Sequence, residues 1–164
     1  MARFGARSSR PALFAAVLFL FAVFAAVPGC GSEGPPGSDA AIPSIYVTPP
    51  LCAGAKKAFD ANPQPGGESV SLVCLDYLIS GHSLASISAG ARRATENSAT
   101  IAYIGEQDRK SVDFARPILE AAGIGDVDTR DGEAAMKVVL RAVRESAGDD
   151  DLRGSVREKL DAAS

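Results

Sequence analysis

The stretch TIAYIGEQDRKSVDFARPILEAAG, residues 100–123, predicts the class of the fold. It opens with an apolar run that has no polar side chain after Thr100, which is typical of a strand buried on both faces of a parallel sheet. Gly105 permits a sharp turn after that strand, and Gly123 is placed to end a helix. Between these glycines, apolar residues recur at helical spacing: Val112, Ala115, Leu119 and Ala122. We therefore expect a buried strand, a polar loop and a helix, in that order.

The rest of the chain repeats this alternation of strands and helices. Apolar and β-branched runs predict earlier strands at residues 44–48 and 69–75, and helical spacing predicts helices at residues 51–61 and 84–97. Two more helices follow a polar connection at residues 125–132. This order predicts an α/β fold, a three-layer parallel sheet of strand order 2-1-3 with helices on both faces. The side chains expected to be mostly buried are Leu72, Val73, Ile101, Tyr103, Met136 and Leu140.

A ligand site is expected beyond the carboxyl ends of these strands, because open α/β sheets bind ligands there. The first strand ends at Thr48, and the third strand leads into a polar loop. Arg109 and Lys110 stand near the start of the following helix, where backbone amides and the helix dipole favour an anionic group. A solvated loop that binds nothing is the alternative. The candidate ligand-binding residues are Thr48, Gly105, Glu106, Arg109 and Ser111.

The first 29 residues have the composition of a secretory signal peptide. A lead with three arginines and no acidic residue precedes the apolar run of residues 12–27, which is shorter than the roughly 20 residues that span a bilayer as a helix. The run ends at VPGC, residues 27–30, which is similar to a bacterial lipobox. We therefore expect Cys30 to carry a lipid, so that the exported protein is anchored to the outer face of the cytoplasmic membrane. Ordinary cleavage near Gly29, leaving a free thiol, is the alternative.

Residues 30–43 are rich in Gly, Pro and Ser and predict a flexible tether, which leaves residues 44–164 as a single folded domain. The chain has 17 basic and 20 acidic residues, and three of the arginines lie in the leader, so the processed chain has 14 basic residues and a net charge of −6. No basic patch of the kind that binds a phosphate backbone occurs, and nucleic acid is not an expected partner.

Two cysteines remain in the expected domain once Cys30 is assigned to the lipid anchor. Cys52 follows the first predicted strand and Cys74 lies within the second. An even pair in an exported protein makes a disulfide a candidate, provided that these two strands are neighbours. Two reduced, buried thiols are the alternative. The spacing matches neither a CxxC motif nor a zinc site.

The sequence carries no recognisable catalytic arrangement. His82 is the only histidine, and no phosphate-binding or nucleophile-elbow motif occurs. The acidic triplet at residues 149–151 is expected to cap the last helix. We therefore expect a protein that is not an enzyme and needs neither a cofactor nor a metal.

Several segments resemble the type I periplasmic binding fold, in particular the lipid-anchored solute-binding proteins of branched-chain amino acid ABC transporters. These segments are IYVTPPL at residues 45–51, SVSLVCLDY at 69–77, ARRATENSATIAYIGE at 91–106 and RPILEAAGI at 116–124. The segment at 131–160 is similar to the last two helices of the same family. In the family, the rest of the first lobe and the whole second lobe separate these parts, so this chain resembles one lobe with its middle missing.

The resemblance implies an extracytoplasmic solute-binding protein, or a truncated derivative of one, that serves an ABC permease. Its expected ligand is an amino acid or another small carboxylate. Where the family usually has a Ser-Gly pair after the third strand, this chain has Arg109 and Lys110. A surface lipoprotein that uses the same scaffold to bind a protein, with no small-molecule ligand, is the alternative function.

Overall fold

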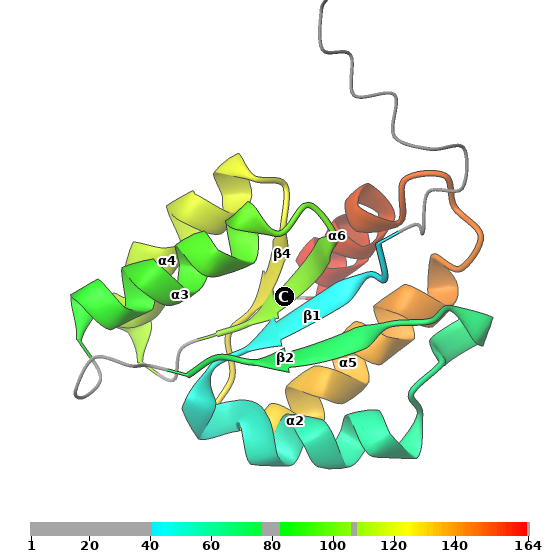
Figure 1. Cartoon of the computed structure of the whole chain (residues 1–164), viewed down its shortest axis with the longest axis horizontal. Coiled ribbons are helices and arrows are strands. Elements are labelled where there is room, and N and C mark those ends of the chain that lie inside the picture. Colours follow the sequence, from blue (N-terminus) through cyan, green and yellow to red (C-terminus); the bar gives the residue numbers. More distant parts are fainter. Residues whose placement is uncertain (1–40, 77–82, 106–107, 164) are drawn as a thin grey trace, which may run out of the picture. The chain divides into compact units, whose positions relative to one another are not determined.

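The strands form one parallel sheet with helices packed on both of its faces (Figure 1). The computed structural model describes residues 41–76, 83–105 and 108–163, which belong to one compact unit. Within these residues the sheet has four strands in the order β2-β1-β3-β4, and every pair is parallel. The strands are β1 (Ser44–Val47), β2 (Ser71–Cys74), β3 (Thr100–Ile104) and β4 (Gly125–Val127).

The helices divide between the two faces, as expected for three layers. They are α2 (Pro49–Ala61), α3 (Leu84–Glu96), α4 (Arg109–Ala121), α5 (Gly132–Glu145) and α6 (Leu152–Ala163). In Figure 1, α3 and α4 lie on one face, and α2, α5 and α6 lie on the other. The predicted α/β class is therefore confirmed, and the first three strands have the predicted order 2-1-3.

The prediction of a polar connection at residues 125–132 was wrong for its first three residues, which form the strand β4. It has only three residues, and Asp126 lies in its middle, so the sequence shows no apolar run there. β4 forms because the edge of β3 offers it backbone partners: Ala102 lies opposite Gly125 and Ile104 opposite Val127. A Cβ at Gly125 would lie 2.9 Å from the Leu160 side chain, so glycine at this position lets α6 pack closely on the strand.

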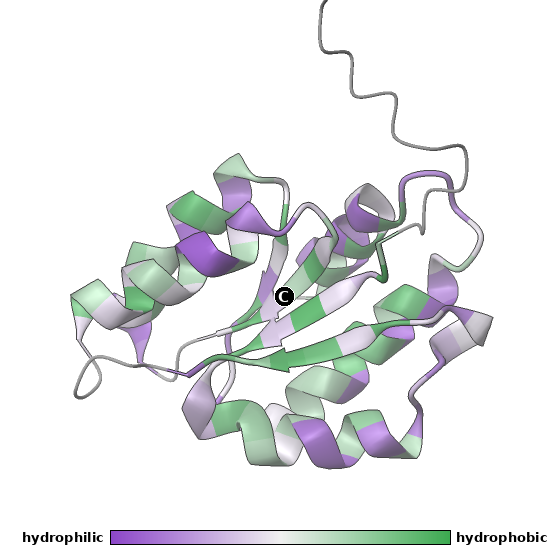
Figure 2. Ribbon diagram, in the orientation of Figure 1, coloured by the Kyte–Doolittle hydropathy of each residue, from purple (hydrophilic) through white to green (hydrophobic). Residues whose placement is uncertain are grey.

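Two hydrophobic clusters fill the space between the layers, one on each face of the sheet. Figure 2 shows hydrophobic residues on the strands and on every helix, mixed with hydrophilic ones. The predicted burial is confirmed for Ile101, Tyr103, Met136 and Leu140, which are at most 5% exposed. Leu72 and Val73 are half-buried and pack against the two clusters, so they are mostly buried as predicted but more exposed than the other four. Both lie on β2, an edge strand in the described sheet that has a neighbouring strand on one side only.

The helices α2 and α5 pack closely because a glycine stands at their first contact. A Cβ at Gly132 would overlap the carbonyl oxygen of Leu51. Asp131 caps α5 from the preceding position, because its carboxylate accepts hydrogen bonds from the amides of Glu133 (2.9 Å) and Ala134 (3.1 Å). The two helices therefore begin side by side near the carboxyl ends of the strands.

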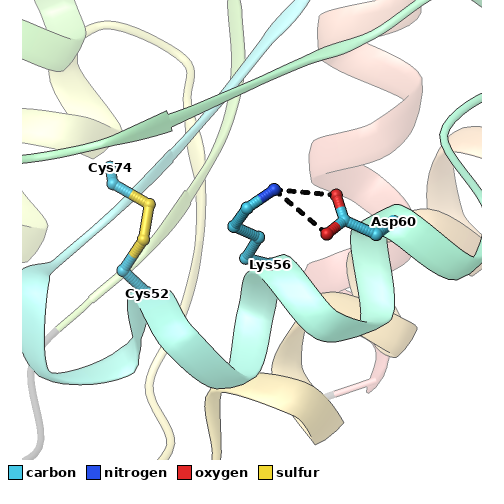
Figure 3. The surroundings of a disulfide bond; sticks show 4 residues. All are labelled: Cys52, Lys56, Asp60 and Cys74. Atoms are coloured by element: carbon cyan, nitrogen blue, oxygen red, sulfur yellow. Dashed lines mark hydrogen bonds and ion pairs between the residues drawn. A yellow bond between two sulfur atoms is a disulfide. The ribbon is translucent and has the colours of Figure 1, made fainter.

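A disulfide joins Cys52 on α2 to Cys74 at the end of β2 (Figure 3). The two Cα atoms are 5.7 Å apart, within the usual range for a disulfide. The bond connects a helix to the half-buried edge strand β2. In the same view, Lys56 forms an exposed ion pair with Asp60 one turn further along α2 (3.0 Å). None of the helices in the described ranges is long and apolar enough to cross a membrane.

Candidate functional site

A groove lies at the carboxyl ends of β3 and β4, which is the edge of the sheet where a ligand site is expected. Its volume is about 380 Å³. Side chains from residues 108–116, at the start of α4, line one wall, and residues 128–130, which follow β4, line the other. We call it the carboxyl-edge groove. The second wall follows β4, a strand that the sequence did not predict. The sequence therefore predicted only the wall formed by α4.

The first turn of α4 is capped by a carboxylate of the chain itself. Asp108 Oδ1 accepts a hydrogen bond from the Ser111 amide (3.1 Å), and Asp108 Oδ2 accepts one from Ser111 Oγ (2.5 Å). Asp108 thus occupies the position at the helix N-terminus where a bound anion would otherwise be favoured. Ser111, predicted to contact ligand, is 3% exposed and directs its hydroxyl to this cap.

Arg116 connects α4 to the strand β4 and to the loop after it. Its Nε donates to Asp126 and its Nη2 donates to Asp128, both at 3.3 Å. Burial raises the pKa of Asp126, and the neighbouring Arg116 opposes this rise. Asp126 in turn raises the pKa of Arg116, so the guanidinium stays charged at any physiological pH. These bonds hold the two walls of the groove together.

The remaining charged side chains of the groove are available to a ligand. In the part of the chain that the structure describes, the side chains of Arg109, Asp113 and Arg130 form no hydrogen bond or ion pair, and all three residues are exposed. With Arg116, Asp108 and Asp128, the groove contains three arginines and three aspartates. A site that offers free charges of both signs suits a molecule with an anionic and a cationic end.

The other predicted ligand residues lie outside this groove or outside the described residues. Thr48 is 1% exposed, and its Oγ1 has no hydrogen-bond partner among the described residues. Its amide donates to the Ile104 carbonyl (3.0 Å), so the backbone of Thr48 continues the pairing of β1 with β3. Gly105 is also buried and donates to the Val127 carbonyl (3.2 Å). Glu106 and Cys30 lie outside the described residues.

Sequence reasoning missed Arg116, Asp128 and Arg130. One signal was present on α4, where Arg109, Asp113 and Arg116 follow the i, i+4, i+7 spacing of a single helix face. No such signal marked Asp128 or Arg130, because the three residues of β4 are too few for the alternation that predicts a strand.

No group of three or more His, Cys, Asp or Glu residues that could hold a metal ion occurs within the described ranges. Comparisons of the chain with protein-family models, curated proteins and solved structures found no significant match.

Proposed function

We propose that this chain is a lipid-anchored, extracytoplasmic solute-binding protein, or a shortened derivative of one, that serves an ABC-type uptake system. The proposed ligand is a small amino acid or a related zwitterion. The observation that carries the proposal is the carboxyl-edge groove with its free charges of both signs. In this proposal Arg109 receives the carboxylate of the ligand and Asp113 receives its ammonium group.

The balance of charge in the groove supports a zwitterion more than a simple anion. Asp108 already caps α4, and Arg116 is already shared between Asp126 and Asp128. A ligand with one negative end would therefore use Arg109 or Arg130 and leave Asp113 without a partner. An amino acid satisfies both groups.

The groove is open to solvent, so we expect weak binding. Because little of the ligand surface would be buried, the expected dissociation constant is about 1 µM to 1 mM. A weak site on one lobe is compatible with delivery of solute to a permease, or with a second protein that completes the pocket.

An NMR titration of the purified protein with leucine tests solute binding. We expect amide shifts around residues 108–113 and 128–130, which need about tenfold more leucine in Arg109→Ala and are unchanged in Arg92→Ala. Arg92 is an exposed arginine on α3, outside the groove, and serves as the matched control. The absence of shifts in these residues at about 10 mM leucine would contradict the proposal and favour a protein-binding lipoprotein.

Detergent partitioning of the expressed full-length chain tests the lipid anchor separately. The wild type should enter the detergent phase, because a diacylglycerol on Cys30 adds two acyl chains. Cys30→Ala should either remain in the aqueous phase or persist as an unprocessed precursor. A wild-type protein found in the aqueous phase would overturn the anchor without affecting the solute site.

A further inference from the structure

A second groove lies between α2 and α5, on the opposite face of the sheet from α4. Its volume is about 520 Å³. The last turns of α2 line one side, and the outward face of α5 lines the other. Its charged side chains are Lys57, Glu133, Lys137, Arg141 and Arg144. It shares no lining residue with the carboxyl-edge groove.

This groove is positive, although the chain as a whole is acidic. Four cationic side chains and one carboxylate line it, whereas the whole chain has a formal net charge of −3. Glu133 is shared by the two lysines: Lys57 donates to Oε2 (2.9 Å) and Lys137 to Oε1 (2.7 Å). These two hydrogen bonds fix both lysines at one end of the groove.

The two arginines at the other end have no such partner. Within the described residues, the side chains of Arg141 and Arg144 form no hydrogen bond or ion pair, and both residues are exposed. Their i, i+3 spacing puts both guanidinium groups on one face of α5. Each guanidinium presents a planar set of donors that matches the oxygens of a phosphate or carboxylate.

The floor between the charged ends is apolar. Leu140 and Ala58 line the groove and are only 5% and 6% exposed, because they also belong to the core beneath it. A ligand can therefore place an apolar substituent on this floor while its charged group reaches Arg141 and Arg144. A phosphate monoester carries about −1.5 to −2 charges at neutral pH, which matches two guanidinium groups better than a single carboxylate does.

We propose that the α2–α5 groove binds a phosphate monoester with an apolar substituent, held by Arg141 and Arg144. Such a group occurs both on soluble organic phosphates and on the lipid phosphatidic acid. This proposal does not rest on solute binding at the carboxyl-edge groove, because the two grooves share no lining residue.

Calorimetric titration of the purified protein with phenyl phosphate tests the site. The groove variant is Arg141→Gln/Arg144→Gln, and the matched control is Arg92→Gln/Arg93→Gln, which removes the same charge from exposed positions on α3. We expect the groove variant to bind at least about tenfold more weakly, and the control to bind like the wild type. Inorganic phosphate should bind more weakly than phenyl phosphate, because it makes no contact with the floor.

Vesicles that contain phosphatidic acid distinguish the two sources of the ligand. Vesicle binding that phenyl phosphate displaces assigns the site to a lipid headgroup, and binding of phenyl phosphate alone assigns it to a soluble ester. Equal binding by the groove variant and the control would overturn the proposal. So would a wild-type protein that binds neither phenyl phosphate nor the vesicles.

Discussion

The two faces of the sheet differ in how much core they bury and in the groove that they carry. On one face, α2, α5 and α6 bury the larger cluster, in which Met136, Val139 and Val143 are 0% exposed. On the other face, α3 and α4 bury a smaller cluster around Tyr103 and leave Phe114 43% exposed. The helices α5 and α6, which follow the last strand, thus help to bury the larger cluster. The carboxyl-edge groove lies on the other side, beside α4 and the smaller cluster.

This difference suggests that stability and solute binding depend on separate parts of the molecule. Substitutions in the α2–α5–α6 layer should destabilise the fold, whereas substitutions among the exposed charges of the carboxyl-edge groove should change binding with little effect on stability. The following predictions test that separation, beginning with the largest expected effect.

The substitution Met136→Ala should cause the largest loss of stability. Met136 is fully buried between α5 and the sheet, and truncation of a buried methionine costs about 2–5 kcal/mol. Phe114→Ala, on the more exposed face, should change the free energy of unfolding by about 0.5 kcal/mol or less. Urea unfolding measures both variants. Equal losses of unfolding free energy in the two variants would contradict the prediction that the cluster packed against α5 contributes more to stability.

Loss of the disulfide should have the next largest effect. The bond between Cys52 and Cys74 closes a loop with a sequence separation of 22 residues and ties the edge strand β2 to α2. The variant Cys52→Ser/Cys74→Ser should lose about 3 kcal/mol, because a disulfide restricts the unfolded chain. Its midpoint of thermal unfolding should not respond to a reducing agent, whereas that of the wild type should fall. If the reducing agent leaves the wild-type midpoint unchanged as well, the disulfide does not stabilise the protein as predicted.

A smaller effect is expected from acid, through Glu133. Hydrogen bonds from Lys137 and Lys57 lower the pKa of Glu133 from 4.5 to about 2 in the folded chain. A lowered carboxyl pKa stabilises the fold above the unfolded pKa, and that contribution is lost as the pH falls from about 4.5 to about 2. The effect is small because the side chains of both lysine partners are largely exposed, Lys57 at 75% and Lys137 at 63%, so solvent screens the two ion pairs.

Glu133→Gln should therefore be slightly less stable than the wild type at pH 7 and equally stable near pH 2. Thermal unfolding across this range measures the difference. Glu145→Gln, at an exposed glutamate at the end of the same helix, controls for the loss of a surface charge. A difference between the wild type and Glu133→Gln that persists unchanged at pH 2 would contradict the assigned role of the two lysines.

The sequence predicted those elements whose local pattern agrees with their final environment. The run at residues 100–104 reads as a buried strand because both of its faces are covered, and α5 reads as a helix because its apolar stripe faces the core. The strand β4 could not be predicted in this way, because its pairing comes from the edge of β3 and not from its own side chains.

The residues of the candidate site also differ in whether a local sequence pattern predicts them. Arg109 lies where the strand-to-helix pattern predicted, at the start of α4, and it lines the groove. Thr48 has the expected position, at the end of β1, but it is only 1% exposed and so cannot reach a ligand in the groove. Arg130 contributes to the site only because β4 directs the following loop towards α4, which no local pattern reveals.

Recognition of a zwitterion by two opposite charges is the central claim, and NMR titration with leucine and two analogues tests it most directly. Leucinol lacks the carboxylate, and N-acetyl-leucine lacks the ammonium group. We expect each analogue to bind about tenfold more weakly than leucine. Arg109→Ala should abolish the preference for leucine over leucinol, and Asp113→Asn should abolish the preference for leucine over N-acetyl-leucine. Equal binding of all three compounds, or no amide shifts around residues 108–113 and 128–130, would contradict the account.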